Sequence, residues 1–184
     1  MKKNVAVLLA KGFEDIEAVA IIDVLRRAGL EVIVAGVGGM EISSAHLLKI
    51  VCDVRVESLD ADSLDMVILP GGFGGTEILA SDSTVQALLR TMDQKNKKIG
   101  AICAAPLALK KADVLKDSYT CYPGVEELIK HQGFRDDVSV VRDGNVITSR
   151  GPGSAICFAL EIAKDLAGLE TYEKIKSGML ASYC

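Results

Sequence analysis

The stretch KKIGAICAAPLALKK, Lys97–Lys111, joins a run typical of a buried strand directly to a run with the pattern of a helix. Cys103 stands at the junction, and we expect the helix to begin there. So tight a turn strains the backbone and exposes the side chain above the sheet, as in a hydrolase nucleophile elbow. The N–H groups at a helix start favour a thiolate, so we expect a lowered Cys103 pKa. The alternative is a small buried apolar cysteine.

Strand-like and helix-like segments alternate along the rest of the chain. Single strands are predicted at 4–10, 30–38, 64–72, 98–102 and 118–123, and a strand, turn and strand within 47–59. A hairpin that turns on Asp143-Gly144 is predicted over 138–149. Helices are predicted at 14–29, 83–97, 103–114, 124–133, 154–168 and 170–180. This alternation predicts one α/β domain over residues 1–184, with a mostly parallel sheet and helices on both faces.

The composition limits the class of protein. The chain has 184 residues, of which 49% are hydrophobic and 4% aromatic, so an aliphatic core around a buried parallel sheet is expected. The net charge is −4 without a basic stripe, and no apolar run approaches the roughly 18 residues of a membrane span, so we expect neither a nucleic-acid nor a membrane partner. The five cysteines are irregularly spaced without a C-x-x-C pair, which predicts a cytoplasmic chain without a disulfide framework or a structural metal site.

Ligands of such folds bind beyond the carboxyl ends of the strands, which here lead into loops at 11–17, 71–75, 103–106 and 150–153. Glu17 follows Ile16 of the apolar face of its helix. Either it is partly buried, which would keep its carboxyl protonated near neutral pH, or it is an ordinary acidic residue near a helix start. Gly71 and Gly72 offer backbone N–H groups for an oxyanion pocket. Arg150 precedes a Gly-Pro-Gly turn and is either part of the site's wall or a solvated side chain.

Five motifs occur in a specific order, namely LLAKGFEDIEA, DVLRRAGLEV, VILPGG, IGAICAAP and TSRGPGSA. In this order and spacing the sequence resembles the ThiJ/PfpI family, in the branch of the parkinsonism-associated protein deglycase. The resemblance covers nearly the whole chain. It implies a flavodoxin-like three-layer α/β/α sandwich, related to class I glutamine amidotransferases, that carries a nucleophile-elbow cysteine and forms homodimers.

The resemblance also implies roles for particular residues. Cys103 matches the family's nucleophile, and Glu17 matches the glutamate that hydrogen-bonds its sulfur. Gly72 and Ala104 match the positions whose N–H groups line the oxyanion pocket, with Gly71 beside them. Ala104 stands where protease-like members have a histidine, so peptidase activity is not expected.

Four further positions match residues at the edge of the site. Arg27 and Arg150 match arginines at or near the pocket and the dimer interface, and His46 stands where a typical member has a pocket-side arginine. Tyr122 replaces a histidine near the cysteine, which leaves the general base unassigned.

The resemblance therefore predicts a cofactor-free, stress-protective enzyme that acts on reactive dicarbonyls or their early adducts, with glyoxalase or deglycase chemistry. A redox-sensing stress protein or chaperone, which would use the oxidation of Cys103, is the alternative. A third reading is a binding module with a vestigial cysteine.

Overall fold

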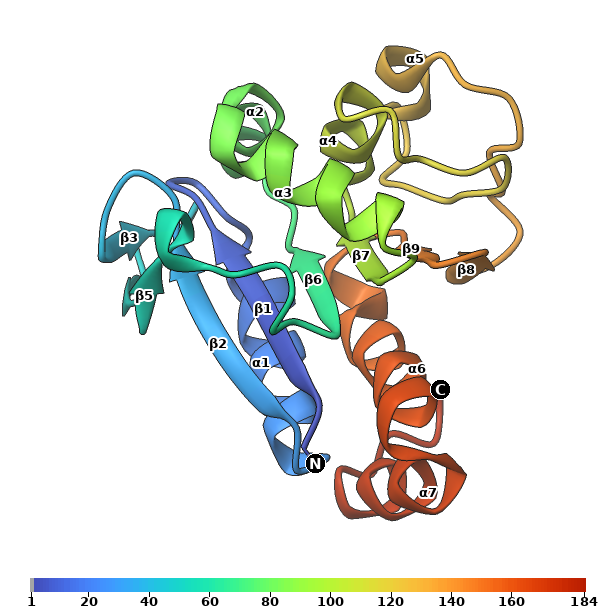
Figure 1. Cartoon of the computed structure of the whole chain (residues 1–184). Coiled ribbons are helices and arrows are strands. Elements are labelled where there is room, and N and C mark those ends of the chain that lie inside the picture. The colour runs from blue at the N-terminus through green and yellow to red at the C-terminus, as the bar shows by residue number, and fades with distance from the viewer. Residues whose placement is uncertain (1) are drawn as a thin grey trace.

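A seven-stranded sheet forms the middle layer of the protein (Figure 1). The computed structural model describes residues 2–184. In spatial order the strands are β5 (Val54–Arg55), β2 (Glu31–Gly36), β1 (Asn4–Leu9), β6 (Met66–Leu69), β7 (Lys98–Ile102), β9 (Val146–Ser149) and β8 (Val140–Asp143). All neighbours pair in parallel except β8 and β9, which form the predicted hairpin.

Helices cover both faces of this sheet and complete the predicted three-layer sandwich. One face packs against α1 (Asp15–Arg27) and α6 (Ala155–Ala167), and α7 (Leu169–Gly178) packs against α6. The other face packs against α2 (Phe73–Ser81), α3 (Ser83–Gln94) and α4 (Pro106–Lys111). The remaining elements are the small hairpin of β3 (Glu41–Ser43) and β4 (Lys49–Val51), the helix α5 (Glu126–Ile129), and the 3-10 turns η1 (Val56–Ser58) and η2 (Pro152–Ser154).

The central strand β1 shows why its sequence is apolar throughout. Val5, Val7 and Leu9 enter the core on the side of α1 and α6. Ala6 and Leu8 enter the core on the side of α3 and α4. Because successive side chains of a strand point to opposite faces, a strand between two helical layers must be apolar at every position.

Helix ends follow local backbone geometry. Gly29 adopts a φ of 76° and ends α1 where the sequence predicts. The helix predicted to begin at Cys103 begins instead at Pro106, because Cys103 itself has a φ of 64°, which a right-handed helix does not allow. Residues 103–105 form a turn between β7 and α4.

Two other local predictions are wrong. The glycine-rich segment after β6 continues into α2, with Gly72 preceding its first residue. Glycine lowers helix propensity, but Gly75 packs closely on the Phe13 backbone, so tertiary contact favours the helix. The predicted strand at 118–123 is reduced to a single bridge between Tyr119 and Phe134.

The expectation of no disulfide is also wrong, because Cys157 and Cys184 are joined. They lie 27 residues apart, and α6 and α7 pack together so that the end of the chain reaches the first turn of α6. Cys52, Cys103 and Cys121 are free and buried.

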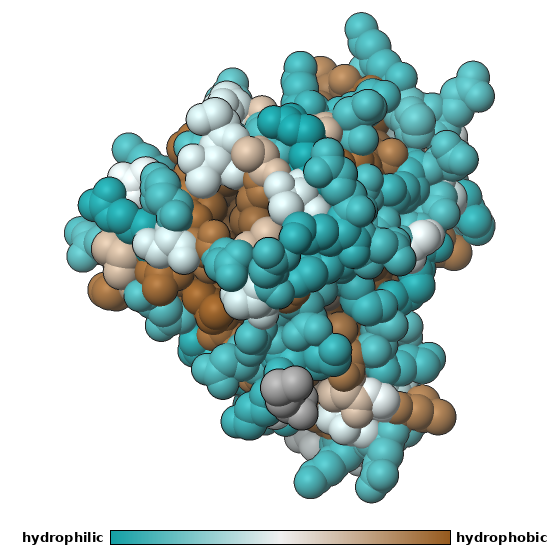
Figure 2. Space-filling model, viewed as in Figure 1, coloured by the Kyte–Doolittle hydropathy of each residue, from teal (hydrophilic) through white to brown (hydrophobic). Residues whose placement is uncertain are grey.

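The surface viewed in Figure 2 is mainly hydrophilic, with apolar residues gathered in a hollow beside the upper ends of β1 and β2. Within residues 2–184, no helix combines the length and apolar character needed to cross a membrane.

Candidate active site

The site lies where the order of the strands reverses. β1 pairs with β2 on one side and with β6 on the other, so the chain leaves their carboxyl ends in opposite directions. Such a switch point is the usual ligand position of open α/β sheets. The loops after β1 and β6 are joined here by the Glu14 N–H, which donates to the Gly71 carbonyl over 3.0 Å.

Cys103 is held rigidly at the end of β7. Its N–H donates to the Ser149 carbonyl over 3.0 Å, and its carbonyl accepts from the Tyr122 N–H over 2.8 Å. A positive φ in a residue other than glycine costs on the order of 1–3 kcal/mol and persists only where surrounding contacts enforce it. The φ of 64° at Cys103 confirms the predicted strained elbow, but the predicted exposure of the side chain is wrong, because Cys103 is only 6% exposed.

Glu17 reaches Cys103 from the first turn of α1. The side chain is fully buried, and its Oε2 accepts from the Gly71 N–H over 2.7 Å. Its Oε1 has no nitrogen or oxygen partner, and the carboxyl contacts the Cys103 thiol. Burial outweighs the bonds from Gly71 and Cys103, and raises the pKa of Glu17 to about 7. The predicted protonation near neutral pH has this physical basis.

The expected low pKa of Cys103 is not found. Burial first, and then the negative charge of Glu17, raise the pKa of Cys103 to about 12. The backbone N–H groups of Gly72 and Ala104 bond to the sulfur and oppose this rise. The sequence-based expectation failed because the thiol lies below the surface and the helix begins after it, at Pro106.

The two glycines after β6 have different roles. The N–H of Gly71 is occupied by Glu17, so Gly71 does not supply the free oxyanion donor that the sequence suggests. A Cβ on Gly71 would lie 2.6 Å from the Cys103 Cβ, which excludes any side chain. A Cβ on Gly72, whose φ is 86°, would lie 2.3 Å from the Gly12 carbonyl oxygen. Glycine at position 71 thus lets the backbone approach Cys103 closely, and glycine at position 72 lets it approach the loop after β1.

Two aromatic residues follow or bond to the backbone that surrounds the cysteine. Phe73 follows Gly72, and Tyr122 donates its N–H to Cys103. Their ring centroids are 6.2 Å apart in an edge-to-face arrangement, and the residues are 63% and 41% exposed. Phe73 was not predicted as a site residue, although an aromatic residue inside a glycine-rich stretch could have indicated it. The guanidinium of Arg150 bonds to the Asp136 carbonyl, which keeps this side chain at the edge.

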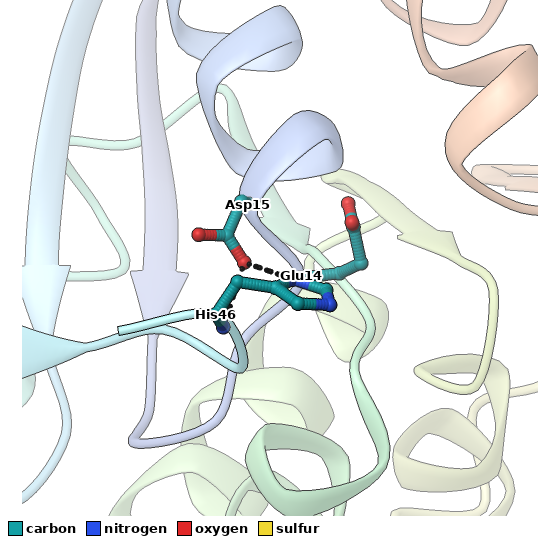
Figure 3. A group of neighbouring side chains, drawn as sticks. All are labelled: Glu14, Asp15 and His46. Atoms are coloured by element: carbon teal, nitrogen blue, oxygen red, sulfur yellow. Dashed lines mark hydrogen bonds and ion pairs between the residues drawn. The ribbon is translucent and has the colours of Figure 1, made fainter. Parts of the chain in front are cut away.

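His46 and Arg27 do not contact Cys103. His46 Nδ1 lies 2.9 Å from Asp15 Oδ2, and Figure 3 shows this pair with Glu14 alongside. One ligand atom from each of these three residues lies within 4.8 Å of the others. However, the Asp15 carboxylate already accepts from Ser44, and that of Glu14 caps α1. Arg27 pairs with Asp23 in the last turn of α1, about 15 Å along the helix from Glu17.

Comparison with known proteins agrees with this geometry. A family model described as the DJ-1/PfpI family matches residues 3–165. The chain is 42% identical over 186 residues to protein dj-1beta of Drosophila melanogaster, with 100% of both chains covered. It is 36% identical over 172 residues to the glutathione-independent glyoxalase DJR-1.2 of Caenorhabditis elegans, which covers 92% of this chain and 91% of that protein.

Solved structures agree as well. The crystal structure of Drosophila melanogaster DJ-1beta matches with a TM-score of 0.94 at 42% identity, and the match covers 98% of each chain. Fold, family model and sequence identity coincide over nearly the whole chain. The protein therefore belongs to the DJ-1/PfpI family.

Proposed function

We propose that this protein is a cofactor-independent, stress-protective enzyme that converts reactive α-oxoaldehydes, free or as early adducts, into 2-hydroxy acids. The observation that carries the proposal is the buried pair of Cys103 and Glu17, with the N–H groups of Gly72 and Ala104 directed at the sulfur. A nucleophile, a proton carrier and two oxyanion donors are the parts that such a reaction needs. The relative named as a glutathione-independent glyoxalase supports this reaction class.

The reaction begins with a proton transfer inside the pair. The ionised form of Glu17, which is present at neutral pH because its pKa is about 7, takes the thiol proton. The charge that raises the pKa of Cys103 then disappears, and the carboxylic acid can donate to the sulfur. The thiolate then forms a C–S bond with the aldehyde carbon, and the carbonyl electron pair moves onto oxygen beside the N–H groups of Gly72 and Ala104.

Glu17 first gives its proton to the alkoxide oxygen, which completes the thiohemiacetal and leaves Glu17 ionised. The carboxylate then takes the proton from the former aldehyde carbon and delivers it to the adjacent carbonyl carbon, while the hydroxyl proton moves to the neighbouring oxygen, so that the thiohemiacetal becomes a thioester. Water hydrolyses the thioester, releases the 2-hydroxy acid and restores the Cys103 thiol. Methylglyoxal and water thus give lactate without external oxidant or cofactor. Glu17 serves as the base that Tyr122, in place of a histidine, does not provide.

Methylglyoxal turnover to lactate tests this proposal. Cys103→Ser should reduce kcat/KM to background, because a serine hydroxyl is a much weaker nucleophile here. Cys52→Ser is the matched control, since Cys52 is also a free buried cysteine but belongs to the loop before β5. Equal rates for wild type and Cys103→Ser would reject the proposal.

A redox sensor is the second candidate, and the unpartnered Glu17 Oε1 favours it. Oxidation of Cys103 to a sulfinate would place an acceptor beside this carboxyl, which could donate to it when protonated. Mild peroxide treatment followed by mass spectrometry should then oxidise Cys103 before Cys52 and Cys121. Even oxidation of all three would argue against a dedicated sensor.

We also propose that the protein forms a homodimer through an apolar surface on α1 and the β3–β4 hairpin. Ile16, Val19, Leu47 and Val51 are exposed by 58%, 46%, 84% and 73%. Val19 and Val51 line one groove of about 320 Å³, so the two elements share a surface. Val51→Glu should give monomers in sedimentation experiments, whereas Leu128→Glu, at an exposed leucine on α5, should not.

A further inference from the structure

We propose that Cys157 and Cys184 form a second, reversible redox site, which reacts with small-molecule disulfides of the glutathione type and thereby fastens or releases residues 182–184. This site is separate from Cys103 and does not depend on the proposed enzymatic function. Cys157 lies in the first turn of α6, and Cys184 is the last residue of the sequence. Their disulfide joins two points that are 27 residues apart.

Access distinguishes this pair from the other cysteines. Cys52, Cys103 and Cys121 are 3%, 6% and 0% exposed, whereas Cys157 and Cys184 are half-buried. Both members of the pair line a cavity of about 340 Å³, near the lower end of the roughly 300–1,000 Å³ typical of small-molecule sites. Thiol–disulfide exchange requires that a sulfur can be reached, so this pair is favoured over the other three.

The lining of the cavity suits a thiol that carries charges of both signs. Arg142, which also pairs with Asp165 over 2.8 Å, and Glu161, which lies 3.8 Å from Lys164, contribute opposite charges. Tyr172 and Tyr183 contribute ring surface. Glutathione and related peptide thiols carry an ammonium group and carboxylates on a flexible chain. The ammonium group is complementary to Glu161 and the carboxylates are complementary to Arg142, which a purely apolar ligand would not be.

Few noncovalent contacts hold the segment that the disulfide fastens. Ala181 is buried, and its N–H donates to the Lys176 carbonyl over 3.0 Å. Leu180 and Tyr183 are 85% and 66% exposed. Met179 also packs against the core, and the N–H groups of Met179 and Leu180 donate to carbonyls of α7. Opening the disulfide therefore leaves residues 179–181 anchored to α7, and we expect residues 182–184 to detach more often.

The exchange balances without a further reactant. In the reduced protein, the Cys157 thiolate attacks a small-molecule disulfide, forms a mixed disulfide and releases one thiol. The Cys184 thiolate then attacks the Cys157 sulfur and releases the second thiol. Two protein thiols and one small disulfide thus give one protein disulfide and two small thiols. Excess small thiol reverses both steps.

The 184-residue protein is equilibrated in mixtures of reduced and oxidised glutathione, trapped with an alkylating agent and examined by peptide mass spectrometry. We expect the Cys157–Cys184 disulfide in oxidising mixtures and two alkylated cysteines in reducing mixtures, with the same transition in Cys103→Ser. Cys184→Ser should instead accumulate a glutathione mixed disulfide at Cys157.

Two results would overturn the proposal. One is that Cys157 and Cys184 are still alkylated after equilibration in oxidised glutathione, which would show that no disulfide forms between them. The other is a disulfide that survives excess reduced glutathione in the folded protein, which would make it a permanent structural link. A carboxypeptidase digestion gives an independent measurement, because the oxidised wild type should resist trimming that the reduced protein and Cys157→Ser both undergo.

Discussion

Replacing Glu17 with glutamine should change how the stability of the protein depends on pH. The fold raises the pKa of Glu17 from 4.5 to about 7, mainly through burial. One pKa unit corresponds to about 1.4 kcal/mol, so an ionised Glu17 makes the folded state less stable by about 3 kcal/mol. Glutamine has nearly the same shape and can still accept from the Gly71 N–H, but it cannot ionise.

The sign follows from the direction of the shift. Below pH 4.5 Glu17 is protonated in both the folded and the unfolded state, so its burial does not reduce the free energy of unfolding of wild type. As pH rises from 4.5 to about 7 the unfolded chain ionises first, so the free energy of unfolding of wild type falls relative to Glu17→Gln. Above the folded pKa the difference should stay constant, at about 3 kcal/mol.

Urea unfolding of both proteins across this pH range measures the difference. Asp23→Asn is the matched control, because it removes an exposed carboxylate from the same helix. Parallel profiles for wild type and Glu17→Gln would refute the reasoning. Thiolate absorbance that appears near pH 7 in wild type but not in Cys103→Ser would show that the sulfur, not the carboxyl, loses the proton.

Three further changes have expected outcomes. Gly71→Ala should abolish methylglyoxal turnover and lower the free energy of unfolding, because its Cβ would lie 2.6 Å from the Cys103 Cβ; wild-type activity would contradict this geometry. Phe73→Leu should lower the ratio of kcat/KM for phenylglyoxal to that for methylglyoxal by about threefold to tenfold, which is the usual contribution of an aromatic contact. An unchanged ratio would show that Phe73 does not contact the substrate. Reducing the disulfide should lower the free energy of unfolding by about 3 kcal/mol in wild type, as measured by urea unfolding, and should have no effect in Cys157→Ser.

Much of the fold follows from local patterns. β1 is apolar at every position because both of its faces are covered, and α1 ends at Gly29 because that residue has a positive φ. α2 was missed because its glycines signal a loop, while their small size is what allows close packing on the Phe13 backbone. Propensity is a weak signal where tertiary contacts decide.

The candidate site was only partly predictable. The abrupt change from strand to helix at Cys103 and the acidic residue beside an apolar face at Glu17 are both visible in the sequence. Phe73 gave no periodic signal. The assignment of the Gly71 N–H to Glu17 joins residues 54 positions apart, and no local pattern records it.

The sequence by itself determined the layered α/β architecture, the elbow at Cys103 and the family, because strand period, helix period and motif order are properties of neighbouring residues. The tertiary structure alone decided the direction in which the pKa of Cys103 shifts, because burial and the charge of Glu17 together raise this pKa where a helix start would lower it. It likewise decided the pairing of Cys157 with Cys184, since only the packing of α6 against α7 brings the end of the chain to the start of α6. The shift of the Cys103 pKa and the pairing of the two cysteines both depend on distances between segments that are far apart in the sequence, and local sequence patterns do not record such distances.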